Sequence, residues 1–335
     1  MEFEFFIGID VSRNELDFSV QQGKCFLFHK EIINEPEAIK GLIKEISKLT
    51  GFSFSSAVFC MEHTGIYSNH LLSCLYQKNA NICLEAATQI KRSLGTLRGK
   101  NDKVDSMRIA AYAYKNRDGL RLWEPRREEV QQLAHLSSTR SRLIRAKKML
   151  KAPLTEYGSF VKRKAAKQNT AACSKALNGI EASLENVEKR ITAIINADPG
   201  LMRLFTLVTS VVGIGKVTAV QIIVTTNEFK DINNAKSYAC YAGVVPYPQE
   251  SGIFKGKGRI SHMANKKVKT LLHMAALVAI QYNNELKLYY ERKINIEKKN
   301  KMSVINAVRN KLVQRVFSCV NQNRPYEKNY LKLLA

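Results

Sequence analysis

The chain has 335 residues, of which 45% are hydrophobic and 24% are charged, as in ordinary soluble globular proteins. Its formal net charge is +24, and an excess of this size attracts a polyanion, most often nucleic acid. An apolar run of about 18 residues, which a transmembrane helix would need, is absent, and MEFEFFIGID does not resemble a secretion signal. We therefore expect a cytoplasmic protein.

The charge is distributed unevenly along the chain. Residues 1–90 carry 7 Lys/Arg against 11 Asp/Glu, a net of −4, while the remainder carries 46 against 18, a net of +28. A ribosomal or chromatin-like binder without chemistry has little reason to keep an acidic module beside a basic one. The contrast favours an enzyme that acts on nucleic acid.

Cysteine and histidine spacing argues against disulfides and zinc. The seven cysteines contain no CxxC pair and lie in apolar stretches, which predicts reduced core thiols. The six histidines show no paired ligand spacing, so a structural zinc site is not expected.

The first 90 residues alternate between apolar runs and amphipathic segments. Three runs separated by short polar turns predict a meander of strands, and later segments predict a helix, a strand, a helix and a strand. The predicted elements span residues 5–11, 16–20, 25–32, 36–49, 55–62, 67–77 and 80–86. This order is that of the ribonuclease-H-like fold.

The middle of the chain predicts long helices. After a helix over 103–117 and a short strand at LRLW (120–123), a polar helical region begins at Pro125 and is expected to be interrupted at Pro153. Apolar residues between 177 and 194 then recur at alternating spacings of three and four, as in a coiled-coil seam. The alternative is a helical hairpin that packs on itself within one chain.

The segment Asp198-Pro199-Gly200 ends this helix and begins a mainly helical third region, which contains a loop-rich stretch at 241–261. The expected domains are an α/β catalytic domain (1–123), a helical coiled-coil region (124–197) and a C-terminal domain (198–335).

Four carboxylates are placed to meet at one site. Asp10 ends the first predicted strand and Glu62 the fourth, and these strands are neighbours in ribonuclease-H-like sheets. Asp102 and Asp105 lie three residues apart at a helix start, which places them on one face. Clustered carboxylates repel unless a hard cation such as Mg²⁺ joins them, and two ions roughly 4 Å apart would suit phosphodiester transfer. The plainer alternative is that each acid is a helix cap or a surface charge.

The sequences GIDVSRNELDF, MEHTGIY and KNDKVDSMRIA resemble the DEDD motif of the bridge-RNA-guided insertion-sequence transposases, relatives of the pilin-gene DNA invertase. These enzymes have an N-terminal domain like that of the RuvC Holliday-junction resolvase. The resemblance implies that Asp10, Glu62, Asp102 and Asp105 bind Mg²⁺ or Mn²⁺. Ser106 departs from the family, which usually has Ala there.

The segment VVGIGKVTA (211–219) fits the turn of a helix-hairpin-helix motif. Gly213 and Gly215 would let the backbone approach a DNA phosphate, with Lys216 beside them. The alternative is a tight turn between two core helices.

The segment YAGVVPYPQESG resembles the core of the same family's C-terminal transposase domain. The resemblance implies that Ser251 is a nucleophile that forms a phosphoserine link to DNA, at a site assembled from both domains and from two subunits; Ser261 is the second candidate. Ala264 replaces a Gly that the family often has. Tyr238 and Tyr241 would either stack on bases or pack in the core. Phosphate contacts are expected from Lys255, Lys257 and Arg259 on a glycine-spaced loop and from Lys266 and Lys267 on the next helix.

The leading interpretation is a transposase or recombinase that cleaves and rejoins donor and target DNA through metal-bound carboxylates and a serine. The resemblance further implies a bacterial or archaeal source, a guide RNA and a homo-oligomer, a dimer that assembles to a tetramer. One alternative is a metal-dependent Holliday-junction resolvase or structure-selective nuclease that hydrolyses DNA with the four acids alone. Another is a binding protein whose catalytic site has decayed.

Overall fold

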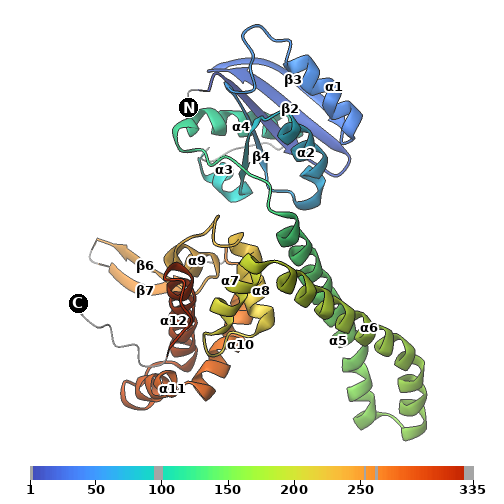
Figure 1. Ribbon diagram of the computed structural model, residues 1–335, viewed down its shortest axis with the longest axis vertical. Coiled ribbons are helices and arrows are strands. Elements are labelled where there is room, and N and C mark those ends of the chain that lie inside the picture. Colours follow the sequence, from blue (N-terminus) through green and yellow to red (C-terminus); the bar gives the residue numbers. More distant parts are fainter. Residues whose placement is uncertain (1–2, 94–100, 253, 261–262, 328–335) are drawn as a thin grey trace. The chain divides into compact units, whose positions relative to one another are not determined.

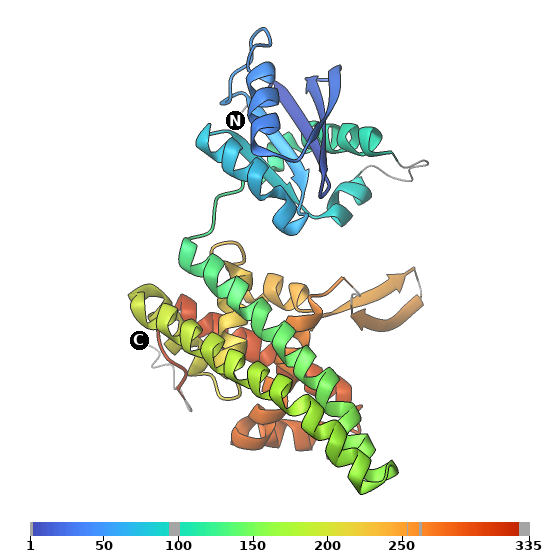
Figure 2. The ribbon, with the colours of Figure 1, turned by 90° about the vertical axis from the view of Figure 1, so that its right-hand side faces the viewer.

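A computed structural model of the chain describes residues 3–93, 101–252, 254–260 and 263–327. The chain forms two compact units, unit 1 (Met1–Pro125) and unit 2 (Arg126–Ala335). Figures 1 and 2 show the two units from perpendicular directions, and each is described here by itself. The predicted division of residues 124–335 into a coiled-coil region and a transposase domain stays a prediction.

Unit 1 is built around a five-stranded sheet with the strand order β3-β2-β1-β4-β5. The first three strands form the predicted antiparallel meander, and β4 and β5 run parallel to β1. The strands are β1 (Phe5–Val11), β2 (Glu15–Gln22), β3 (Cys25–Ile33), β4 (Ala57–Glu62) and β5 (Asn81–Glu85). The order expected of a ribonuclease-H-like sheet is therefore present.

Helices cover both faces of this sheet, and the alternation of side chains along β1 determines which helix each residue meets. Odd-numbered residues such as Phe5 and Ile7 pack in a core with α1 (Pro36–Ile46) and α2 (Asn69–Gln77). Phe6 faces the other way, into a core with α4 (Asp102–Lys115). Asp10 has the same parity as Phe6, so its side chain projects on the α4 face.

Short elements complete unit 1: η1 (Gly65–Ser68), α3 (Ala87–Ser93) and η2 (Arg117–Gly119). The strand predicted at LRLW is wrong, because only Leu122 pairs there, in an isolated bridge to Cys83. Four of the cysteines are buried as expected, whereas Cys25 is exposed at the start of β3.

Unit 2 begins with two long antiparallel helices, α5 (Glu128–Phe160) and α6 (Arg163–Ala197), which form a hairpin visible in both views. The expected break at Pro153 is wrong: α5 continues through it. Pro153 lies near the end of the hairpin and is exposed, so the carbonyl that loses its hydrogen-bond partner there is not enclosed in a core and the missing bond costs little. The apolar seam of 177–194 lies on α6, whose Val187 is buried, and α6 packs against α5 of the same chain. This arrangement matches the hairpin alternative.

The rest of unit 2 is a helical core with one β-hairpin. Its largest fully buried side chain is Tyr238, which packs between Phe317 and Tyr241. The elements are α7 (Pro199–Thr209), α8 (Lys216–Thr226), α9 (Ala235–Tyr241), β6 (Pro246–Ser251), β7 (Phe254–Ile260), α10 (Lys266–Tyr282), α11 (Asn284–Glu291), η3 (Arg292–Ile296) and α12 (Lys301–Asn321). Over the described residues, no single helix meets the length and apolarity needed to cross a membrane, and one bent pair, α6 with α7, meets them only when joined across a 111° bend.

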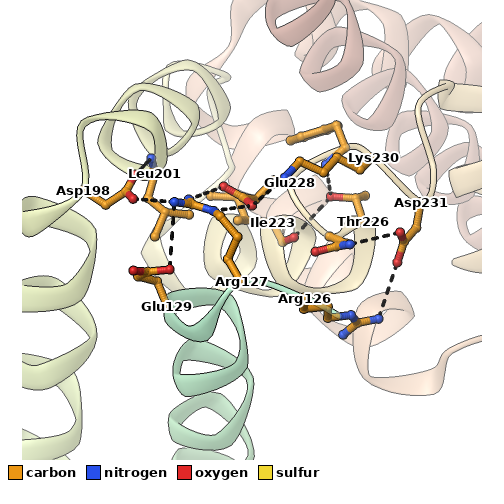
Figure 3. Close-up of polar contacts among 12 residues, drawn as sticks. Arg126, Arg127, Glu129, Asp198, Leu201, Ile223, Thr226, Glu228, Lys230 and Asp231 are labelled. Carbon is orange, nitrogen blue, oxygen red and sulfur yellow. Dashed lines mark hydrogen bonds and ion pairs between the residues drawn. The ribbon is translucent and has the colours of Figure 1, made fainter. Parts of the chain in front are cut away.

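Arg127 ties the base of the hairpin to the core of unit 2 (Figure 3). Its guanidinium donates two hydrogen bonds to Glu228, at 3.0 and 2.5 Å, and one to Asp198 at 2.7 Å. These bonds raise the pKa of Arg127 and lower the pKa of Asp198. Asp198 also caps α7 by accepting from the Leu201 amide. One side chain thus fixes the start of α5, the end of α6 and the turn after α8.

Candidate metal centre and the serine hairpin

The carboxylate centre starts where the C-terminal ends of β1 and β4 meet, at one edge of the unit 1 sheet. β1 and β4 pair in parallel with Ile9 opposite Met61, so Asp10 and Glu62, the next residues, reach the same edge side by side. Both project on the α4 face. This placement is what the predicted strand order required.

Helix α4 brings the other two acids to that edge. Asn101 caps the helix by accepting from the Lys103 amide, so Asp102 and Asp105 fall in the first turn, where the helix dipole favours negative charge. The helix crosses β1 at Gly8, where a Cβ atom would lie 2.2 Å from the backbone nitrogen of Ala110 and the backbone oxygen of Ser106. Only glycine permits this approach.

Three of the four predicted acids form a tight group. Carboxylate oxygens of Asp10, Asp102 and Asp105 lie within 4.8 Å of one another. Burial, together with the negative charges of Asp102 and Asp105, raises the pKa of Asp10 from 3.8 to about 6. Burial is the larger cause of this shift, and the repulsion that adds to it is what a divalent cation would relieve, so the site fits a hard metal ion.

Glu62 is outside this group of three, although its charge also contributes to the raised pKa of Asp10. Its partner in the β4–β5 pairing is Glu85, another strand-end acid. Sequence reasoning missed Glu85, although its position at the end of an apolar strand gave the same signal as Asp10 and Glu62. The edge therefore presents a larger acidic surface than four residues.

Two neighbouring ion pairs bound the centre. Asp105 binds Arg108, one turn along α4, at 2.7 Å. Asp17 pairs with Asp10 across β1 and β2 and hydrogen-bonds His29 at 2.8 Å. Asp105 thus has a cationic partner in the same helix, whereas the groups that raise the pKa of Asp10 include Asp17 beside it.

Ser106, which departs from the family pattern, has a structural explanation. It is fully buried under β2, and its hydroxyl lies 2.8 Å from the Ser19 hydroxyl and donates to the Lys103 carbonyl. An alanine would leave Ser19 without this partner. The serine pair joins α4 to the sheet one turn from Asp102.

Ser251 lies on a different kind of support in unit 2. The stretch expected to be loop-rich is instead the antiparallel hairpin β6–β7, with Ser251 at the end of β6 opposite Phe254. Ser251 is exposed and is followed by Gly252, whose φ is +55°. Lys255, Lys257 and Arg259 are on β7 rather than on a loop, and Ser261 lies outside the described residues.

The helix-hairpin-helix candidates separate into packed and exposed residues. Gly213 has φ +99° and packs against α10, where a Cβ would lie 2.5 Å from the Ala275 oxygen. Gly215 and Lys216 are exposed at the start of α8. The structure therefore explains Gly213 by helix packing, while Gly215 and Lys216 remain accessible to a ligand.

The remaining predicted residues lie on or near α10. Lys266 is exposed at its start, but Lys267 is half-buried and donates to the Ser137 hydroxyl of α5 at 3.0 Å. Burial and the nearby Arg140 lower the pKa of Lys267. Lys267 thus joins two helices of unit 2.

Two other details of this region follow from packing. Of the two alternatives for Tyr238 and Tyr241, the core placement is the one observed. Ala264 faces Gly243, which has φ +63°: a Cβ on Gly243 would lie 2.2 Å from that of Ala264. The missing family glycine is accommodated by a glycine on the facing segment.

Comparison with known proteins agrees with this geometry. Residues 7–157, which contain all four predicted acids, match a DEDD-type family model described as "Transposase", and residues 205–291, which contain Ser251, match "Transposase IS116/IS110/IS902 family". The chain is thus a transposase, an enzyme of DNA strand cleavage and transfer. Over these two segments it matches the IS110 family of DEDD transposases.

Two curated relatives extend the match over almost the whole chain. The pilin gene-inverting proteins of Moraxella bovis and Moraxella lacunata are each 24% identical over 332 residues, covering 96% of this chain and 98% of theirs. Among solved structures, RuvC of T. thermophilus in complex with a Holliday junction substrate aligns with 36% of this chain and 99% of its own, at 12% identity and a TM-score of 0.28.

Proposed function

We propose that the protein is a DNA recombinase that cleaves and rejoins strands through a serine, with divalent metal held by the sheet-edge carboxylates. The observation that carries the metal half is the group formed by Asp10, Asp102 and Asp105, within 4.8 Å of one another. Their hard oxygen ligands favour Mg²⁺, with Mn²⁺ as a substitute. Glu62, at the same edge, would complete the set. Bound metal would supply Lewis-acid stabilisation of the charge that develops on phosphate oxygens.

The serine half of the proposal concerns Ser251. Its Oγ would attack a DNA phosphorus, forming an Oγ–P bond while a P–O bond to deoxyribose breaks. The serine gives up its proton to solvent, and the departing sugar oxygen takes one up. Attack by the hydroxyl of a second strand reverses the step and joins the new ends. An exposed position beside a flexible glycine suits a nucleophile that must reach a DNA backbone.

The experiment traps the covalent step. We expect purified protein with Mg²⁺ and end-labelled element-end DNA to give a labelled protein adduct on denaturing gels. Ser251→Ala should abolish the adduct and the joined product, whereas Ser303→Ala, an exposed serine on α12, should retain both. Loss of the adduct in Ser261→Ala with retention in Ser251→Ala would move the nucleophile to Ser261.

A metal-dependent resolvase or nuclease is the second candidate. One observation favours it: the acidic group is already assembled within unit 1, and metal-bound carboxylates alone can support hydrolysis. This candidate predicts cleaved DNA from Ser251→Ala at the wild-type rate, without any adduct. That outcome would replace the serine mechanism by hydrolysis.

We further propose that the recombinase acts as a homo-oligomer on donor and target DNA and is guided by RNA. Support comes from the net charge of +28 on residues 91–335, more than metal-centre chemistry requires. Sequencing the nucleic acid that co-purifies with the protein tests this. One defined short RNA would support a guide, and a random RNA population would contradict it.

A further inference from the structure

The far end of the α5–α6 hairpin carries an unusual concentration of positive charge. Residues 149–167 contain five Lys/Arg and one Asp/Glu, a net of +4. We call residues 149–167 the hairpin tip. In both views the tip extends away from the other helices of unit 2 (Figures 1 and 2). It is therefore a basic projection rather than part of the core.

Carboxylates neutralise the basic residues nearer the base but not those at the tip. Arg140 binds Glu188 at 2.8 Å and Lys147 binds Glu181 at 2.7 Å, both across the hairpin. At the tip, by contrast, none of the carboxylates within the described ranges forms an ion pair with the exposed cations Lys162, Arg163, Lys164 and Lys167. These charges remain available to an outside anion.

Exposed aromatic rings accompany these charges. Phe160 is 89% exposed, the highest value among the large apolar side chains that the structure describes, and Tyr157 is 42% exposed. The two lie three residues apart in the last turn of α5, hence on one side of the helix. Apolar rings left in water among unpaired cations favour a ligand that offers both flat faces and negative charge.

Unpaired nucleic acid meets both requirements, because its bases stack on aromatic rings while its phosphates bind Lys and Arg. Duplex DNA offers the phosphates but keeps its base faces hidden. A second copy of the tip would bring another strongly positive surface, which like-charge repulsion opposes. The seam that could have joined two copies is already engaged between α5 and α6.

We propose that the hairpin tip binds an unpaired segment of DNA, with bases stacked on Phe160 and Tyr157 and phosphates held by Lys162, Lys164 and Lys167. The choice of DNA rests on the proposed function, because strand exchange exposes unpaired bases. The binding itself needs neither the carboxylates nor Ser251.

The test measures binding without chemistry, in the full-length Asp10→Asn variant and without divalent metal. Fluorescence anisotropy would compare a single-stranded DNA, the same sequence as a duplex, and the same sequence as RNA. We expect Phe160→Ala to weaken single-stranded DNA binding about ten-fold, the scale of one stacking contact, and to leave duplex binding within two-fold. The control Ile296→Ala removes the next most exposed large apolar side chain of the described residues, 75% exposed, and should change neither.

The charge contribution has its own control. Lys164→Gln with Lys167→Gln should lower the salt slope of single-stranded DNA binding by about 1.4, because each phosphate contact contributes about 0.7. The pair Lys298→Gln with Lys299→Gln, exposed on another part of unit 2, should leave the slope unchanged.

Several results would overturn the proposal. One is that Phe160→Ala weakens duplex binding as much as single-stranded DNA binding. Another is that the protein with an unchanged tip binds RNA more tightly than DNA of the same sequence. A third is that Phe160→Ala changes the oligomeric state measured by light scattering while DNA binding stays intact. Because binding is measured in a protein that cannot cleave, these outcomes are independent of whether Ser251 is the nucleophile.

Discussion

The two candidate reaction centres differ in how firmly the fold holds them. Asp10, Asp102 and Asp105 sit on a buried strand and on a helix pressed against it at Gly8. Ser251 is at the end of an exposed two-stranded hairpin. A metal site needs ligands fixed within a fraction of an ångström, whereas a nucleophile that changes partners benefits from a movable support. The predictions below test this contrast, beginning with the largest effect.

Asp10→Asn should reduce DNA cleavage on the order of 10³-fold, because losing several kcal/mol of metal-assisted stabilisation costs a factor of ten for every ~1.4 kcal/mol. Cleavage rates with saturating Mg²⁺ measure this, and Asp118→Asn, an exposed acid of unit 1, should stay at the wild-type rate. An active Asp10→Asn would remove the metal centre from the mechanism.

Gly8→Ala should destabilise unit 1 by about 3 kcal/mol and weaken metal binding, because its methyl group would push α4 and two of the acids away from β1. Trp123, the single tryptophan, packs on the unit 1 core and reports urea unfolding of this unit. Gly41→Ala has open space around its Cβ within α1 and should be neutral or stabilising. Equal free energies of unfolding for the two variants would mean that α4 is not held by its contact at Gly8.

Magnesium binding should depend on the protonation of Asp10, whose pKa is raised to about 6. Metal binds the ionised carboxylate, so affinity should rise as pH increases through 6 and level off above it. Without metal, the stability of unit 1 should change with pH in the opposite direction. The folded protein retains a proton that the unfolded chain loses near 3.8, so unit 1 should lose stability as pH rises from 4 to 6. Calorimetry and Trp123 melting at several pH values measure both trends, and in Asp10→Asn both should disappear.

Gly252→Ala should have the smallest effect. A left-handed φ of +55° costs a non-glycine residue about 1 kcal/mol, but no other atom lies near this glycine among the described residues. We expect a several-fold decrease in the serine–DNA adduct and no change in Trp123 unfolding. A global loss of stability would show that the hairpin is part of the core and contradict the contrast drawn above.

Sequence patterns predict unit 1 well because its strands and its acidic positions are determined by residues close together in the sequence. The apolar runs gave β1 and β4, the strand-end position gave Asp10 and Glu62, and the spacing of Asp102 and Asp105 gave one helical face. What could not be predicted depends on contacts between distant segments. The distance between α4 and β1 at Gly8 determines which acids group tightly. The serine that pairs with Ser106 is 87 positions away in the sequence.

In unit 2 two predictions are wrong because the outcome depends on the surroundings of the segment. Pro153 was expected to end a helix, but its position near an exposed hairpin end makes the lost hydrogen bond inexpensive. The segment 241–261 has glycines and polar residues that resemble a loop, yet its alternation supports two paired strands. Sequence propensity does not reveal which segments will find a partner.

The bonds of Arg127 have a consequence for how this chain can change over evolution. Arg127 precedes α5 and Asp198 follows α6, yet their side chains are 2.7 Å apart, so the hairpin of residues 128–197 begins and ends at one point. The base of the hairpin packs in the core through Val130, Leu133 and Ile195, and only its outer part projects beyond the core. A segment anchored in this way behaves as an insertion. Removing matched turns from both arms would shorten its reach without displacing the helices beneath, and descendants could acquire longer or shorter arms while the remainder of the enzyme stayed intact.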